Sequence, residues 1–345
     1  MKKTDPNFDR FRAAVTRDHL PDRLPVCEIE IDMEIMDAFL GRSVASVKDY
    51  AEFWRRAGYD YALLFVLGQP LPDHFHQFKI GQKTQSESLS SSTFDVNMGV
   101  KDQKTFEEYP WIGPEEVFYD DVDAIREYLP DGMKLVVNQG PLFSGMWRVM
   151  GLEAFAIACY ENPDLIRAVA EKMGELCVNI AENILQRDWV GAYWMGDDMA
   201  YTTSLMVSPD FLRTHVFPYY KRIGDLCRRY EKPFLLHSDG DNTEVFEDFI
   251  ECGVAAMHPN EPTSVDVVAL KKEYGDRLGF LGALDVDLLT RGTVEDVVKA
   301  TRYLIENAAT GGGYALGSGN SITKHVPLEN YKAMLETVRS FGGIY

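Results

Sequence analysis

The stretch KPFLLHSDGDNTEVFEDFIECGVAAMHPNEP, residues 232–262, contains a strand, a helix and a second strand in succession. An apolar run leads to His237, a helical pattern begins near Thr243 and ends at Gly253, and a second apolar run follows. Strands that alternate with helices form a parallel sheet, because each crossover helix returns the chain to the same edge. This unit predicts an α/β fold.

The same alternation extends outward in both directions. We predict eight strands, at residues 24–31, 59–68, 133–140, 189–198, 232–241, 254–262, 278–287 and 312–322. Eight such units closing on themselves form a (β/α)8 TIM barrel. An open doubly wound sheet is the structural alternative, but no GxGxxG motif follows the first strand.

The chain length of 345 residues suits a single barrel domain. We expect one domain over residues 1–345 with a helical extension at its N-terminus. Residues 69–115 match neither a strand nor a helix pattern well, and we expect a long loop or hairpin over the barrel mouth. Such a loop would help to select the substrate.

Composition narrows the class of protein. The formal net charge is −19, which disfavours nucleic acid as a partner. No apolar run approaches the length of a membrane helix, and the first 15 residues lack the apolar centre of a signal peptide. The five cysteines form no CxxC pair. We therefore expect a cytoplasmic protein without structural disulfides.

Polar residues follow nearly every predicted strand, at the end where barrel enzymes bind substrate. They are Glu28, Glu30, Asn138, Gln139, Asp197, Asp198, Tyr201, His237, Asp239, Asp241, His258, Asn260, Glu261, Asp285, Asp287, Ser318, Asn320 and Ser321. Any one carboxylate could simply cap a turn. So many together would repel one another, and a bound cation would relieve that repulsion.

The sharpest grouping is His237 and Asp239 with Glu261. Alternate residues of a strand point the same way, so His237 and Asp239 can share one centre, and Glu261 follows the neighbouring strand. An imidazole and two carboxylates suit zinc or another divalent metal. The alternative is a hydrogen-bonded His–Asp pair at a turn.

Four segments resemble the uroporphyrinogen decarboxylase superfamily: residues 140–172, 196–223, 235–262 and 311–327. They match its strand-three loop and helices, its Asp-Asp loop with a Ser-Pro helix start, its strand-five histidine and its last strand. The resemblance runs from about residue 130 to the end and implies a TIM barrel. It also favours a homodimer.

The porphyrinogen-binding motif of that superfamily is missing. Uroporphyrinogen decarboxylase holds its substrate with an arginine-rich RQAGRY-type motif, whereas residues 21–36 here read PDRLPVCEIEIDMEIM. An acidic pocket disfavours a substrate with eight carboxylates. We therefore expect the other branch, the zinc-dependent methyltransferases that work with corrinoid proteins.

That branch implies specific ligands. Its pattern is His-x-Cys after strand five, a Glu after strand six in some members, and a Cys after strand eight. Here His237 and Glu261 match, Asp239 replaces the first Cys, and Ser318 stands at the second. An oxygen-rich site is better suited to polarising an ether oxygen than to activating a thiol.

The resemblance thus implies a methyltransferase that moves methyl from a methoxylated, perhaps aromatic, donor to cob(I)alamin, as in anaerobic O-demethylation. The cobalamin would reside on a separate corrinoid protein, since the chain has no DxHxxG signature. The expected metal ligands are His237, Asp239 and Glu261, with Ser318 as a ligand or a bystander. We expect Asp198, Tyr201 and Asn138 to position substrate or donate protons. The expected substrate-binding residues are Glu28, Glu30, Phe143, Trp147, Met195, Asp197 and Asn320, although the apolar ones could be ordinary core.

Two other hypotheses stay open. The chain could be another lyase or hydrolase on the same barrel, or a non-catalytic member with a decayed metal site. The absent cysteines favour the loss of the metal site. An intact active site is favoured by the retained residues His237, Glu261, Asp197 and Asp198. Metal analysis of the purified protein would separate these hypotheses.

Overall fold

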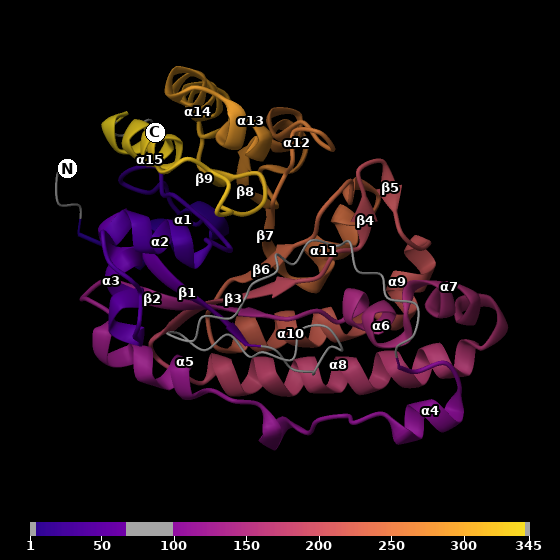
Figure 1. Ribbon diagram of the computed structural model, residues 1–345. Coiled ribbons are helices and arrows are strands. Elements are labelled where there is room, and N and C mark those ends of the chain that lie inside the picture. The colour runs from indigo at the N-terminus through magenta and orange to yellow at the C-terminus, as the bar shows by residue number, and fades with distance from the viewer. Residues whose placement is uncertain (1–4, 67–98, 342–345) are drawn as a thin grey trace.

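The computed structural model describes residues 5–66 and 99–341 (Figure 1). A sheet of seven parallel strands in the order β1-β2-β3-β6-β7-β8-β9 forms the centre of the molecule. The strands are β1 (Tyr61–Val66), β2 (Lys134–Gln139), β3 (Val190–Gly196), β6 (Phe234–His237), β7 (Val254–His258), β8 (Gly279–Leu284) and β9 (Tyr314–Ser318). Nearly all their residues are buried, because helices cover one face and the other lines the barrel interior.

The predicted first strand, residues 24–31, is not a regular strand, and this expectation needs correction. The segment makes two isolated parallel bridges beside β9, Val26 to Leu316 and Ile31 to Ile322. Towards β1 it is held by a side chain, since the Glu28 N–H donates to the Tyr61 hydroxyl at 2.8 Å. Pro25 has no N–H to donate, which also limits regular pairing. The segment therefore fills the eighth barrel position irregularly.

Helices alternate with the strands as predicted. They are α1 (Phe8–Thr16), α2 (Met33–Leu40), α3 (Val47–Ala57), α4 (Gln103–Glu108), α5 (Asp120–Ala124), α6 (Phe143–Met150), α7 (Leu152–Glu161), α8 (Pro163–Leu185), α9 (Pro209–His215), α10 (Phe217–Arg229), α11 (Phe246–Cys252), α12 (Val267–Tyr274), α13 (Val286–Arg291), α14 (Val294–Ala308) and α15 (Leu328–Ser340). Short 3-10 turns lie at Pro114–Glu116, Ile125–Tyr128 and Thr243–Val245. The side chains of Asn162, Ser208 and Thr293 cap the first turns of α8, α9 and α14.

The predicted loop at 69–115 is described only in part. Residues 67–98 lie outside the described residues. The remainder contains α4, which packs near α8 (Figure 1). A small antiparallel hairpin, β4 (Ala200–Tyr201) with β5 (Ser204–Leu205), follows β3 and was not expected.

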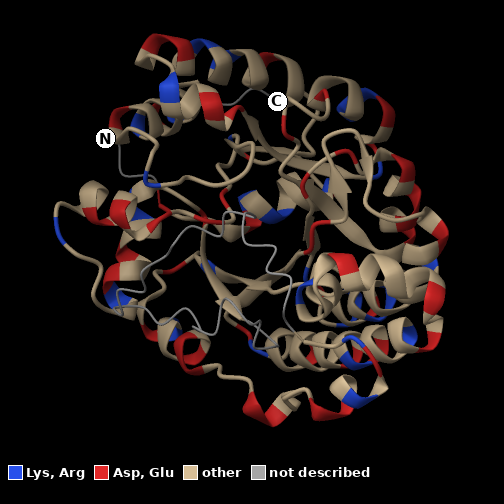
Figure 2. Cartoon of the chain, turned by 45° about the vertical axis from the view of Figure 1, so that its right-hand side comes forward, with Lys and Arg blue, Asp and Glu red and all other residues tan. Residues whose placement is uncertain are grey.

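Acidic residues lie all around the molecule. Figure 2 shows them along the outer helices, interspersed with lysine and arginine, and also on loops near the centre of the view. No helix in the described ranges is long and apolar enough to cross a membrane. All five cysteines are free.

Candidate metal centre

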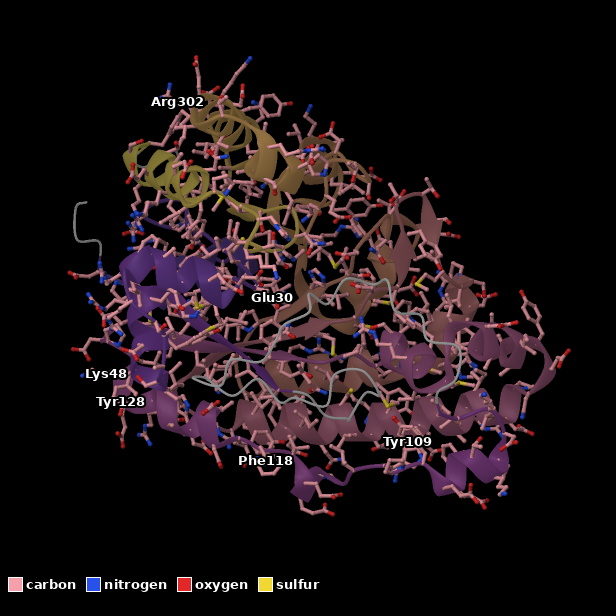
Figure 3. All side chains as sticks on the ribbon, viewed as in Figure 1. Glu30, Lys48, Tyr109, Phe118, Tyr128 and Arg302 are labelled. Atoms are coloured by element: carbon pink, nitrogen blue, oxygen red, sulfur yellow. The ribbon has the colours of Figure 1, made fainter. Side chains whose placement is uncertain are left out.

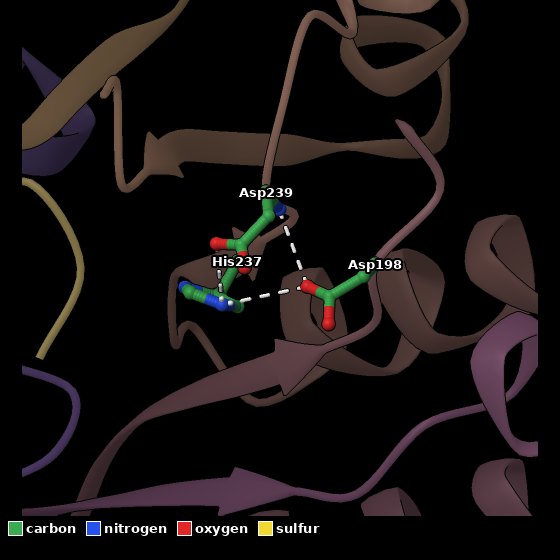
Figure 4. A group of neighbouring side chains, drawn as sticks. All are labelled: Asp198, His237 and Asp239. Atoms are coloured by element: carbon green, nitrogen blue, oxygen red, sulfur yellow. Dashed lines mark hydrogen bonds and ion pairs between the residues drawn. The ribbon is translucent and has the colours of Figure 1, made fainter. Parts of the chain in front are cut away.

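Three side chains converge where β3 and β6 end. The two strands are neighbours, with Gly196 opposite His237, so the loops that follow them lie together. Asp198, His237 and Asp239 each offer one ligand atom, and these atoms lie within 4.8 Å of one another (Figure 4). The Nε2 atom of His237 is 3.5 Å from Asp198 Oδ1 and 3.4 Å from Asp239 Oδ1. We call these three residues the Asp-His-Asp group.

The backbone around this group is firmly held. The Asp239 N–H donates to Asp198 Oδ1 at 3.2 Å, which ties one loop to the other. The buried Asn242 amide donates to the carbonyl of Asp239, and its Oδ1 accepts from the Ser238 hydroxyl. Gly240 has φ +80°, and a Cβ there would approach the Tyr201 carbonyl to 2.3 Å. The group is thus pre-arranged by the fold.

The electrostatics of the group favour a cation. Burial, together with the Asp198 and Glu261 carboxylates, raises the pKa of Asp239 to about 6 against the lowering effect of His237. A divalent cation between these oxygens would offset both the cost of burying the carboxylates and the repulsion between them. The three side chains are 13%, 32% and 38% exposed for His237, Asp198 and Asp239, so an ion could keep open positions towards solvent. One imidazole and two carboxylates fit a first-row divalent metal.

Glu261, grouped with His237 and Asp239 in the sequence analysis, is not one of the three. Its Oε1 accepts a hydrogen bond of 3.0 Å from the Asn320 amide, which also donates to Asp239 Oδ1 at 3.0 Å. Asn320 therefore joins the two carboxylates and orients Asp239. Asp198 was expected to position substrate or donate protons. It lies beside His237, in the position that was predicted for Glu261.

Ser318, the last residue of β9, is bound to Glu28 of the neighbouring segment. Its hydroxyl donates to Glu28 Oε2 at 2.5 Å and its N–H donates to Oε1 at 2.8 Å. Both residues are fully buried. Burial raises the pKa of Glu28 to about 8 in spite of the Ser318 bonds. Ser318 thus lies with Glu28 rather than in the Asp-His-Asp group.

Glu30 lies two residues further along the same segment. Burial, with a smaller contribution from Asp32, raises its pKa to about 7 against the lowering effect of His237. Figure 3 places Glu30 in the central part of the molecule, whereas Lys48, Phe118 and Arg302 lie at its edge. Glu30 is therefore a largely buried carboxyl group close enough to His237 for their charges to interact.

His258, the last residue of β7, was not assigned a role from the sequence. Its Nδ1 lies 2.7 Å from His237 Nδ1, and its ring is 1% exposed. Burial lowers its pKa well below the ordinary value, and His237 lowers it further. The strand-end position of His258 was the one available signal, since pairing of two histidines depends on strand register.

Asn138 and Tyr201 occupy different surroundings. Asn138 is buried near Gly196, and its Nδ2 has no hydrogen-bond partner within the described parts of the chain. Tyr201 is 52% exposed on the β4–β5 hairpin, where its carbonyl accepts from the Asp241 N–H at 2.9 Å. Asn138 is thus able to donate a hydrogen bond to a ligand inside the barrel. Tyr201 is exposed at the barrel mouth, where a ligand could contact it.

Most of the other residues expected to bind substrate instead make hydrogen bonds or packing contacts within the fold. The buried Asp197 carboxylate accepts from three N–H groups, of Leu142, Phe143 and Ser144, and from the Tyr220 hydroxyl. Phe143 packs against Phe155 and Phe211 of the outer helices, and Met195 is fully buried on the face of β3 that carries Tyr193. Trp147 is half-buried on α6, beside Arg148.

Comparison with known proteins identifies relatives of this chain. The family model described as uroporphyrinogen decarboxylase matches residues 90–341. A uroporphyrinogen decarboxylase from Anaeromyxobacter dehalogenans (strain 2CP-C) is 25% identical over 232 residues, which cover 65% of this chain and 63% of that protein. A methyltransferase from Methanosarcina mazei has the same fold, with a TM-score of 0.70 and 17% identity over 96% of this chain and 98% of that one.

Proposed function

This chain belongs to the uroporphyrinogen decarboxylase family, and from that premise we propose that it is a metal-dependent methyltransferase. Its reaction would move a methyl group from a methoxylated compound to the cob(I)alamin of a separate corrinoid protein. The observation that carries the proposal is the Asp-His-Asp group, three ligand atoms within 4.8 Å on adjacent strand ends.

Each residue of the site would have a separate role in binding the cation or the substrate. His237, Asp198 and Asp239 would hold a divalent cation, zinc by preference, and Asn320 with Glu261 would orient Asp239. A cation bound there would supply Lewis-acid polarisation of the ether oxygen of the methyl donor. Asn138 would donate a hydrogen bond to the substrate inside the barrel, and Tyr201 would contact it at the mouth.

The proposed transfer balances without an external oxidant. The carbon–oxygen bond of the donor would break, the oxygen would keep the bonding pair, and the methyl group would pass to cob(I)alamin, which would supply the electron pair of the new bond. Glu30, whose pKa is raised to about 7, is suited to give that oxygen a proton. Exclusion of water by the barrel walls would strengthen the electrostatic stabilisation of the leaving oxygen.

Porphyrinogen decarboxylation is the activity that the names of the relatives suggest, and the charge of the site argues against it. The Asp198, Asp239 and Glu261 carboxylates lie together near the strand ends. A substrate with eight carboxylates would meet repulsion from these acids. We therefore assign the chain to methyl transfer rather than to that decarboxylation.

The test is methylation of free or protein-bound cob(I)alamin, followed by its absorbance, with methoxylated aromatic and methylamine-type donors. We expect methylcobalamin to form with a methoxylated donor and zinc-loaded protein. The His237→Ala variant should lose the activity, and the His19→Gln variant, which alters an exposed histidine, should keep it. Conversion of uroporphyrinogen without any cobalamin methylation would contradict the proposal.

A further inference from the structure

His258 and His237 make a direct ring-to-ring hydrogen bond. The two Nδ1 atoms are 2.7 Å apart, so one nitrogen donates and the other accepts, with one proton between them. This contact leaves the Nε2 of His237 facing Asp198 and Asp239. The second histidine thus binds the first on the side away from the Asp-His-Asp group.

The surroundings of His258 fix the position of its ring. The edge of Trp194 packs against it, with ring centroids 5.3 Å apart at 87°. Gly282 lies close on another side, where an added Cβ would come within 3.2 Å of His258 Cδ2 and 2.4 Å of the Ser318 carbonyl. The carbonyl of His258 accepts from the Ser238 N–H at 3.0 Å. The ring therefore has little freedom to turn.

The direction of the shared proton follows from chemistry. A neutral histidine that binds a cation through Nε2 keeps its proton on Nδ1. That proton would be donated to Nδ1 of His258, which places the proton of His258 on its own Nε2. His258 is buried, and the unprotonated Nδ1 of a neutral ring at 2.7 Å can accept this proton.

We infer that His258 is a positioning residue that fixes the tautomer and orientation of His237 for cation binding at Nε2. The inference rests on the proposed function. Histidine ligands of metals usually donate their second N–H to a carboxylate or a carbonyl, which makes the ligand more basic. A neutral imidazole in that position donates less charge, so the cation would keep more of its Lewis acidity.

Cation affinity tests the role of His258 without any turnover. We would measure zinc binding by chelator competition, and the absorption spectrum of Co²⁺ in the same site, for His258→Leu and His258→Gln. The leucine removes the acceptor and should weaken zinc binding by about 10- to 100-fold, with an altered Co²⁺ spectrum. The glutamine carries an acceptor oxygen and should stay within about threefold of the unmodified protein.

The control is His19→Gln, at the far end of the barrel. His19 is exposed, and the nearby Arg17 donates to the carbonyl of Ala255 at the beginning of β7. This variant should bind zinc as the unmodified protein does. Circular dichroism would establish that each variant is folded. Unchanged zinc affinity and an unchanged Co²⁺ spectrum in folded His258→Leu would overturn the inference.

A second measurement separates this inference from the proposed function. Long-range ¹H–¹⁵N NMR on the histidine-labelled, metal-free protein reports which nitrogen of each ring is protonated. We expect Nδ1–H on His237 and Nε2–H on His258, and the reverse pattern would overturn the inference whether or not zinc binds. Absence of zinc binding in the unmodified protein would instead contradict the metal-dependent function.

Discussion

At the scale of single residues, Glu28 is a buried acid whose carboxylate accepts hydrogen bonds from the hydroxyl and the N–H of Ser318. Its pKa is about 8 in the folded protein and near 4.5 as an ordinary glutamate. Between these values the folded state holds one more proton than the unfolded state. The free energy of unfolding should therefore fall as pH rises through this range, by about 1.4 kcal/mol per unit from this group.

Replacement of Glu28 by Gln tests that dependence. The amide keeps an acceptor for Ser318 and cannot ionise, so Glu28→Gln should gain stability relative to the unmodified protein as pH rises from about 5 to 8. Denaturant unfolding at several pH values measures the difference. Glu34→Gln, at an exposed position, is the control. Parallel pH profiles for Glu28→Gln and the unmodified protein would be inconsistent with a buried neutral acid.

The ligand set provides a second prediction at this scale. Asp198→Ala removes a ligand atom of the Asp-His-Asp group, whereas Glu261→Ala removes a carboxylate that reaches Asp239 through Asn320. We expect zinc affinity to fall by about 100-fold or more in the first variant and by roughly tenfold in the second. Calorimetric titration measures both, and a larger loss for Glu261→Ala would reverse this ranking.

The sequence predicted part of this site. His237 and Asp239 could be paired because the predicted strand at 232–241 placed them two residues apart, although β6 ends at His237 and Asp239 follows it in the loop. The choice of Asp198 over Glu261 as their neighbour could not be predicted, since it depends on the bond from the Asp239 N–H and on the Asn320 amide between Asp239 and Glu261. The His237–His258 pair was missed for the same reason, because strand register is a property of the assembled sheet.

At the scale of elements, the loop after β3 organises the start of α6. Asp197 accepts four hydrogen bonds there, three from consecutive N–H groups at 2.7–3.1 Å and one from Tyr220 at 2.7 Å. The next residue, Asp198, points instead into the candidate centre (Figure 4). Neighbouring aspartates thus serve the fold and the site.

This division can be tested with matched variants. Asp197→Asn replaces a carboxylate oxygen by a donor that faces other donors, so we expect a loss of about 3 kcal/mol in the free energy of unfolding. Asp198→Asn in metal-free protein should change it by less than about 1 kcal/mol. Denaturant unfolding in the presence of a chelator compares them. Equal losses would show that the two aspartates do not divide their roles in this way.

Elements were predicted with different success. Seven strands and the helix starts at Asn162, Ser208 and Thr293 were predictable, because buried apolar runs and capping residues are local signals. Residues 24–31 were predicted as a strand, yet the Tyr61 hydroxyl accepts the Glu28 N–H and the pairing is reduced to two bridges. The β4–β5 hairpin, four residues in strands, is too short to leave a pattern.

At the scale of the whole molecule, we propose that the chain is one barrel domain with its metal between strand ends. A single cooperative unfolding transition is then expected, and its midpoint should rise with zinc. Zinc at about 100 times its dissociation constant would add about 2.7 kcal/mol to the free energy of unfolding. Calorimetry of chelator-treated and zinc-loaded protein measures this, with His237→Ala as a control that should not respond. Two separate transitions would contradict the single domain.

The central claim is that Asp198, His237 and Asp239 together hold a divalent cation. Anomalous X-ray diffraction from crystals of the zinc-loaded protein, recorded on both sides of the zinc absorption edge, tests it most directly. We predict one peak per chain between His237 Nε2 and the two Asp carboxylates. A peak bound by other side chains, or no peak at this position, would contradict the account.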